Sequence, residues 1–224
     1  MAGGALFIEC DVQLCRDMVP VLFHDHDLTR VCGVPGAVHT FDFQELQKLS
    51  AAEQPRFGKH FLHEPIATLA QLLTCVRTHP AVTVFVELKK DNFDQFSRER
   101  GIAGVLRLLN GFAQQAVVIS YDQEILRHVK KSGWKTVGAV CDHWNDADDE
   151  SCRALDPDYI FFDIQGLPKM GRLDTRKAKT VVFEVADWST ACALTARGAF
   201  LIETFAVGEM LARLARAHAA GSLL

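Results

Sequence analysis

Short apolar runs alternate with amphipathic segments along most of the chain. Seven runs rich in Val, Ile, Leu and Phe have the length and composition of buried strands: residues 6–12, 82–88, 116–120, 136–141, 159–163, 180–185 and 200–203. A shorter extended piece, residues 19–23, is predicted to lie beside the first of them. Near-continuous apolar strands separated by helical patterns indicate a parallel sheet that helices cover.

The segments between these runs carry helix-capping residues at their starts. Thr68 is followed three positions later by Gln71, which predicts a capping box and a helix as far as about residue 78. Asp122 and Asp187 are predicted to cap two further helices, and the last helix is expected near the end of the chain: residues 123–131, 188–196 and 207–219.

This rhythm favours a TIM-type (β/α)8 barrel, and 224 residues is close to the size of one such domain. The seven strands fall one short of the eight that a closed barrel needs, so the first strand and helix of the barrel are expected to be missing. A doubly wound open sheet is the alternative, but no Gly-rich phosphate loop follows any strand. We predict a single domain over residues 1–224.

One stretch breaks the alternation of strands and helices. Residues 25–67 form a connection much longer than an ordinary loop between a strand and a helix. We predict that they form a small inserted subdomain at the mouth of the barrel.

Composition excludes several classes of protein. A net charge of −4 with 23% charged residues argues against a nucleic-acid binder, which would need a basic face. No apolar run approaches the roughly 18–20 residues of a membrane span, and the N-terminus lacks the basic start of a signal peptide. Seven irregularly spaced cysteines are typical of reduced thiols, which predicts a cytoplasmic protein.

Polar groups follow the apolar runs at the point where the chemistry of a barrel is expected. Glu9 and Asp11 end the first run, His24 ends the short extended piece, and Glu87 and Lys89 end the next run. Carboxylates two positions apart on a strand share a face, so these groups can converge on one hard cation such as Mg²⁺ or Ca²⁺. Each motif alone is weak, since Glu-x-Lys is usually a surface ion pair. Their recurrence on successive strands predicts phosphodiester cleavage.

The order of these motifs resembles that of the glycerophosphodiester phosphodiesterase family. The similar segments are IECDV at residues 8–12, VLFHDHDLTR at 21–30, VELK at 86–89, VFEV at 182–185 and GAFLIET at 198–204. The likeness runs from end to end of the chain, and the first two motifs together are specific. The resemblance implies hydrolysis of glycerophosphodiesters, within glycerol and lipid metabolism, to sn-glycerol 3-phosphate and an alcohol.

The resemblance also implies a role for each matching residue. Three carboxylates would bind a divalent cation, one histidine would be a general acid or base, one lysine would contact the phosphate, and one phenylalanine would replace a tryptophan beside the glycerol group. In that order they are Glu9, Asp11 and Glu87, then His24, Lys89 and Phe183.

The sequence departs from the family at its start. The family opens with a strand ending in His-Arg-Gly, which supplies the first catalytic histidine, and residues 1–8 contain no such motif. The alternative is therefore an impaired or non-enzymatic relative that binds a ligand or partner. A lysophospholipid substrate is a third reading, although the sequence shows no evident exposed apolar helix. An open barrel with unpaired edges further predicts a homo-oligomer.

Overall fold

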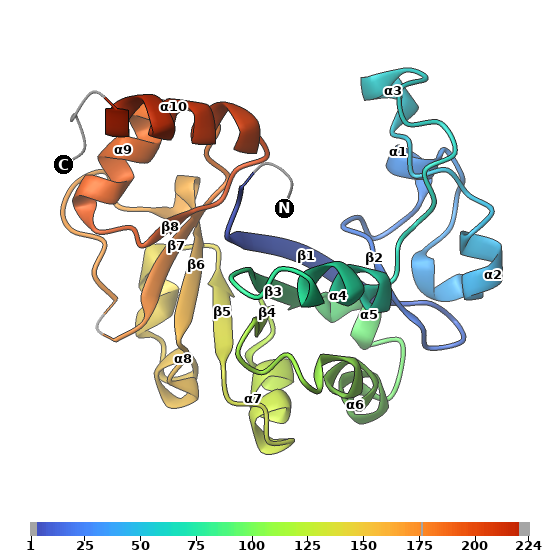
Figure 1. The fold of residues 1–224 in the computed structure, drawn as a ribbon. Coiled ribbons are helices and arrows are strands. Elements are labelled where there is room, and N and C mark those ends of the chain that lie inside the picture. Colours follow the sequence, from blue (N-terminus) through green and yellow to red (C-terminus); the bar gives the residue numbers. More distant parts are fainter. Residues whose placement is uncertain (1–3, 176, 220–224) are drawn as a thin grey trace.

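A computed structural model describes residues 4–175 and 177–219 of the chain. Its centre is an eight-stranded sheet in the order β2-β1-β3-β4-β5-β6-β7-β8, which curls into an incomplete barrel (Figure 1). The strands are β1 (Phe7–Leu14), β2 (Pro20–Leu22), β3 (Thr83–Leu88), β4 (Ala116–Ser120), β5 (Val137–Cys141), β6 (Tyr159–Asp163), β7 (Lys179–Phe183) and β8 (Leu201–Ile202).

Seven of these strands run parallel, as the sequence predicted. The exception is β2, which forms an antiparallel pair with the last three residues of β1. The parallel register between β1 and β3 sets Asp11 directly beside Glu87. The sheet therefore brings two of the predicted site residues together through its backbone pairing alone.

Helices cover the outer face of the sheet (Figure 1), and each lies between two strands in the chain except α10 (Val207–Ala219), which follows β8. The other longer ones are α4 (Leu69–Arg77), α6 (Arg98–Leu109), α7 (Gln123–Lys131), α8 (Glu150–Leu155) and α9 (Trp188–Arg197). Shorter ones are α5 (Lys90–Phe93), η2 (Trp144–Asp148) and η3 (Ile164–Gly166).

The predicted caps of three helices are confirmed. Thr68 and Gln71 form the capping box of α4, with each side chain bonded to the other's backbone N–H. Asp122 accepts from the first turn of α7, and Asp187 accepts from the Thr190 N–H at 2.8 Å in α9. Side-chain oxygens thus satisfy backbone donors that these helices leave unpaired at their starts.

Alternate residues along the strands build two separate cores. Val84, Val86 and Leu88 of β3 point outward and pack among the apolar faces of the surrounding helices. Phe85, between them, points inward and packs with Phe161 and other residues inside the barrel. This alternation follows from the two-residue period of a strand. It explains why the sequence reads as continuous apolar runs.

The long connection between β2 and α4 has its own small core. It contains α1 (Thr29–Cys32), η1 (Val38–Thr40), α2 (Phe43–Leu46) and α3 (Gln54–Phe57), which stand apart from the barrel in Figure 1. Its core is buried next to the end of β2 and includes Leu28, Val38, Leu46 and Ile66. This separate cluster supports the predicted inserted subdomain over residues 25–67, which stays a prediction.

The incomplete barrel leaves two strand edges facing one cavity. In the described part of the chain, β8 pairs only with β7, and residues 7–11 of β1 pair only with β3. A cavity of about 780 Å³ lies between them, lined by Phe7, Leu201 and the apolar face of α10. This helix buries none of its described residues. Its large apolar side chains are partly buried, and none of them is among the exposed hydrophobic side chains of the described residues.

We expect these open edges to drive self-association of the chain. Phe205 is 66% exposed, Leu6 55% and Phe200 49%, and all three border the unpaired edges. Unpaired strand edges next to exposed apolar groups favour pairing with another copy. Light scattering after gel filtration should give a mass above the 24.9 kDa of one chain, and a Phe205→Lys, Leu6→Lys double variant should lower it. A wild-type monomer at every concentration would contradict this prediction.

Within residues 4–175 and 177–219, no helix combines the length and the apolar character that crossing a membrane requires.

Candidate active site

β1 presents a row of polar side chains on one face. Glu9, Asp11 and Gln13 alternate with Cys10 and Val12, so all three point to the same side of the sheet. Glu87 of β3 joins them because its Cα pairs with that of Asp11. Four polar groups are thereby held on adjacent strands.

The predicted carboxylates do meet in space. One oxygen each of Glu9, Asp11 and Glu87 lies within 4.8 Å of the others. Lys89, which follows β3, places its Nζ 2.8 Å from Asp11 and 3.1 Å from Glu87. The single positive charge of Lys89 therefore faces three carboxylates. This leaves an excess of negative charge in a largely buried place.

Burial makes this excess charge costly in the metal-free protein. Burial raises the pKa of Glu9 to about 9, and the charges of Asp11, Glu203 and Glu87 act in the same direction. Burial also raises the pKa of Glu87, although Lys89 opposes the rise. Among the described residues, Glu9 Oε1 is buried without a hydrogen-bond partner. A buried carboxylate oxygen without a partner needs a proton or a cation.

The residues present fit a divalent cation. Three carboxylates at neighbouring strand ends are the oxygen-rich set that Mg²⁺ and Ca²⁺ prefer. The unpartnered Oε1 of Glu9 provides a ligand atom that no side chain of the described chain uses. Asp11, Glu9 and Glu87 are the groups that would hold the ion.

We expect the stability of the metal-free protein to fall as pH rises from about 5 to 9. In this interval the folded chain keeps a proton on Glu9, whose pKa is raised from 4.5 to about 9, while the unfolded chain releases it. Added cation should raise the melting temperature more at high pH, because ligation requires the ionised form. Glu9→Gln should flatten both trends in a thermal-shift assay. Unchanged pH and cation responses in that variant would contradict the prediction.

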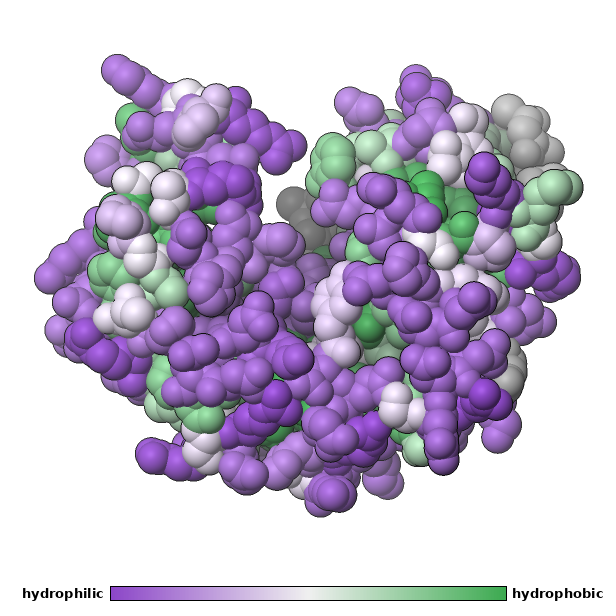
Figure 2. Space-filling model, turned by 180° about the vertical axis from the view of Figure 1, so that it is seen from behind, coloured by the Kyte–Doolittle hydropathy of each residue, from purple (hydrophilic) through white to green (hydrophobic). Residues whose placement is uncertain are grey.

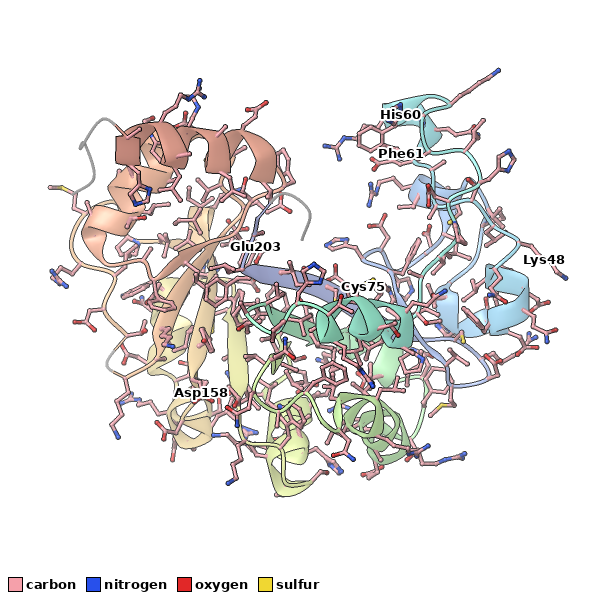
Figure 3. The ribbon with its side chains drawn as sticks, in the orientation of Figure 1. Lys48, His60, Phe61, Cys75, Asp158 and Glu203 are labelled. Carbon is pink, nitrogen blue, oxygen red and sulfur yellow. The ribbon has the colours of Figure 1, made fainter. Side chains whose placement is uncertain are left out.

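A fourth carboxylate near this cluster was not predicted as a site residue. Glu203 follows β8, and Figure 3 shows it beside the start of β1. Burial raises its pKa to about 7, with further contributions from Glu184, Asp11 and Glu87. The signal was present in the sequence, because Glu203 is a polar residue at the end of an apolar run.

His24 lies at the rim beside the carboxylate cluster. It lines a cavity of about 250 Å³ together with Glu87 and Lys89. Its Nδ1 lies 2.9 Å from Asp25 Oδ1, while 70% of its side chain is exposed. The imidazole is thus oriented by one carboxylate and otherwise open to whatever enters the cavity.

The same cavity contains residues that the sequence did not single out. Gln13, His26 and Tyr121 line it, the last from the chain just after β4. Burial, followed by the charge of Asp142, raises the pKa of Tyr121 to about 12, so its hydroxyl keeps its proton at neutral pH. Phe183 lies elsewhere: it is half-buried at the end of β7 and packs against the apolar interior of the barrel.

The surface is hollowed between the inserted segment and the body of the barrel. Figure 2 shows this notch from behind, with polar side chains on its walls and apolar ones gathered near α9 and α10. His60 and Phe61, at the tip of the inserted segment, lie on the opposite side of the notch from Glu203 in Figure 3. The polar cavity of His24 includes Glu87 of the carboxylate cluster, whereas Glu9 and Glu203 line the larger cavity beside α10.

Comparison with known proteins gives one consistent result. The sequence model of the "Glycerophosphoryl diester phosphodiesterase family" matches residues 1–159. Glycerophosphodiester phosphodiesterase 1 of Mus musculus is 28% identical over 142 residues, which are 62% of this chain and 40% of the relative. The glycerophosphodiester phosphodiesterase of Caldanaerobacter subterraneus is 30% identical over 131 residues, 58% of this chain and 52% of the relative. The chain thus spans about half or less of these curated relatives.

Solved structures show the same fold. A phosphodiesterase of Oleispira antarctica, solved with the product sn-glycerol-3-phosphate, has a TM-score of 0.80 at 21% identity. The match covers 96% of this chain and 87% of that one. The glycerophosphodiester phosphodiesterase of Thermotoga maritima has a TM-score of 0.68 at 17% identity, over 95% of this chain and 87% of that one. The fold, the carboxylate cluster and the sequence match agree, and the chain belongs to the glycerophosphoryl diester phosphodiesterase family.

Proposed function

We propose that the chain hydrolyses glycerophosphodiesters to sn-glycerol 3-phosphate and an alcohol, with Mg²⁺ or Ca²⁺ held by Glu9, Asp11 and Glu87. The observation that carries this proposal is the cluster of three carboxylates within 4.8 Å, next to Lys89 and His24. A negatively charged phosphodiester cannot approach such a cluster unless its charge is balanced. Membership of the family supports the reaction class.

In this proposal, two kinds of group balance the negative charge of the phosphate. When bound, a divalent cation would polarise the phosphoryl oxygens and stabilise the charge that develops on them. Lys89 Nζ, now 2.8 Å from Asp11, can turn one of its three N–H donors to a phosphoryl oxygen at the same place. Electrostatic stabilisation of this kind is often the largest single contribution to catalysis.

His24 moves the proton in this proposal. Asp25 has its pKa lowered to about 2, chiefly by its hydrogen bonds from Arg30, so it is ionised and can only accept. Nδ1 of neutral His24 therefore carries the proton that it shares with Asp25, which leaves Nε2 as a free acceptor. In the imidazolium form, Nε2 can give a proton to the leaving alcohol oxygen. Two further parts of the proposal rest on the sequence alone. The role of Phe183 beside the glycerol group rests on the resemblance to the family, and the cytoplasmic location rests on the irregularly spaced cysteines.

The test is a product assay under control of the cation. The purified chain is incubated with glycerophosphocholine and followed by ³¹P NMR, first with a chelator and then with Mg²⁺ or Ca²⁺ in excess. The proposal expects glycerol 3-phosphate to form only when the cation is present. Saturable binding of the diester without turnover would favour the alternative of a non-enzymatic relative, and neither binding nor turnover would refute both.

A further inference from the structure

We propose that Gln13 and Glu53 are positioning residues for His24, the first acting on its backbone and the second on its imidazole through Arg30 and Asp25. The inference rests on the proposed function for its kinetic consequences, because that function makes His24 the proton-transfer group. Its structural content stands separately, since it states what holds His24 in place.

Gln13 clamps the chain on both sides of His24. Its Nε2 donates to the Phe23 carbonyl at 2.8 Å and to the Asp25 carbonyl at 2.7 Å. The side chain is almost wholly buried, with Gln13 only 3% exposed. Both N–H donors of the amide are therefore used by the backbone of one short turn. Because Gln13 sits on the rigid β1, this turn is fixed relative to the carboxylates of the same strand.

A chain of ion pairs reaches His24 from the other side. Arg30 donates to Asp25 through two nitrogens, at 2.6 Å and 2.7 Å, in a bidentate contact. Its remaining nitrogen, Nη1, lies 2.8 Å from Glu53 Oε1. Asp25 in turn holds His24 Nδ1 at 2.9 Å. Glu53, Arg30, Asp25 and His24 thus form one connected series.

Glu53 extends this series further into the inserted segment, to which Asp25 and Arg30 also belong. It precedes α3, and its N–H donates to the Val31 carbonyl at 2.8 Å, which ties it to the end of α1. Its side chain is 17% exposed, against 51% for Arg30. The more buried Glu53 carboxylate therefore fixes one edge of the Arg30 guanidinium, and another edge of the same group orients Asp25. Planar bidentate pairs of this kind add geometric specificity as well as energy.

His24 needs this support because little else holds its ring. Its side chain is 70% exposed, so packing does not restrict its rotamers. An exposed side chain samples several rotamers unless hydrogen bonds select one. The hydrogen bond to Asp25 selects one orientation and one tautomer, and it does so only while Asp25 itself is fixed. Misplacement of a catalytic group by about 1 Å can cost roughly a hundredfold in rate.

The test reads the imidazole directly by ¹⁵N NMR and the reaction by steady-state kinetics. In the wild type, neutral His24 should show the signature of a proton on Nδ1. Glu53→Gln, which keeps an oxygen acceptor but removes the charge, should shift His24 toward a mixture of tautomers. We expect kcat to fall about tenfold to a hundredfold with little change in KM. Gln13→Met, which keeps the volume and removes both donors, should broaden the same signal and lower kcat similarly.

Two matched controls separate positioning from general stability. Glu45, elsewhere in the inserted segment, makes the corresponding ion pair with Arg16 of the β1–β2 connection, at 3.0 Å. Gln115 donates to the carbonyls of His79 and Val82, both at 3.0 Å, at the opposite end of the sheet. Glu45→Gln and Gln115→Met should leave the His24 signal and kcat unchanged.

An unaltered His24 signal in both Glu53→Gln and Gln13→Met would overturn the inference. If Gln13→Met fails to fold, the result for Glu53→Gln decides the inference alone, since the side chain of Glu53 lies outside the barrel core. A wild type that turns over no diester would refute the proposed function, yet the NMR comparison would still judge whether the two residues position His24. Altered signals with unchanged kcat would refute the catalytic consequence.

Discussion

Replacing Glu9 or Glu87 by glutamine should abolish cation-dependent turnover. Both carboxylates belong to the group whose oxygens lie within 4.8 Å of one another, and neither has a substitute on the same strand positions. Loss of a ligand removes several kcal/mol of charge stabilisation, which corresponds to roughly a thousandfold or more in rate. Turnover of glycerophosphocholine and the calorimetric affinity for Mg²⁺ and Ca²⁺ should fall together in each variant.

Glu203→Gln is the informative comparison for these variants. Glu203 raises the pKa of Glu9 through its charge but does not belong to the three-carboxylate cluster. Its replacement should leave a measurable affinity for the cation and partial activity. Full activity in both Glu9→Gln and Glu87→Gln would remove the basis for the proposed site.

Replacing His24 by glutamine should lower kcat by about 10²–10⁴-fold, the range expected for loss of a general acid or base. The cation affinity should stay close to that of the wild type, because His24 belongs to the rim and not to the carboxylate cluster. This combination distinguishes loss of proton transfer from loss of the metal site. Single-turnover kinetics would show the effect on the chemical step itself.

His26→Gln serves as the control for His24. His26 lines the same cavity and lies near His39, with ring centroids 6.5 Å apart and the two rings tilted by 56°. Since the chain of contacts from Asp25 ends on His24, we expect less than about a tenfold effect at His26, below the range for a general acid or base. Equal losses in the two variants would mean that the proton-transfer role of His24 is wrongly assigned.

The fold could be predicted largely because strands in a covered parallel sheet are apolar on both faces. The inward Phe85 and the outward Val84 and Val86 make one unbroken run, which identifies the strand and nearly its ends. The prediction erred at β7, which ends at Phe183 and not at Val185. Val185 is apolar because it is buried in the cluster beneath α9, so its hydrophobicity reports packing against a helix.

The carboxylate cluster could also be predicted, since its members follow a rule of position. Glu9, Asp11 and Glu87 alternate along strands whose carboxyl ends share one rim. Lys89 obeys the same rule and is found in contact with Asp11 and Glu87.

The supports of His24 could not be predicted. Gln13 bonds only to backbone carbonyls, so no partner side chain marks its role in the sequence. Glu53 and Arg30 are 23 positions apart in a segment whose helices have only three or four residues each. Such short helices carry no periodic pattern to fix their packing. The small core around Leu28 and Leu46 brings the two residues together, and this core becomes visible only in three dimensions.

The central claim is that a divalent cation on these carboxylates enables phosphodiester hydrolysis. The most direct test compares two titrations of the same protein preparation. One measures turnover of glycerophosphocholine as the cation is added back after chelation, and the other measures cation binding by calorimetry. The account predicts that half-maximal turnover falls at the measured Kd of a single site, and that Asp11→Asn loses both signals. Full turnover in the presence of the chelator would contradict it.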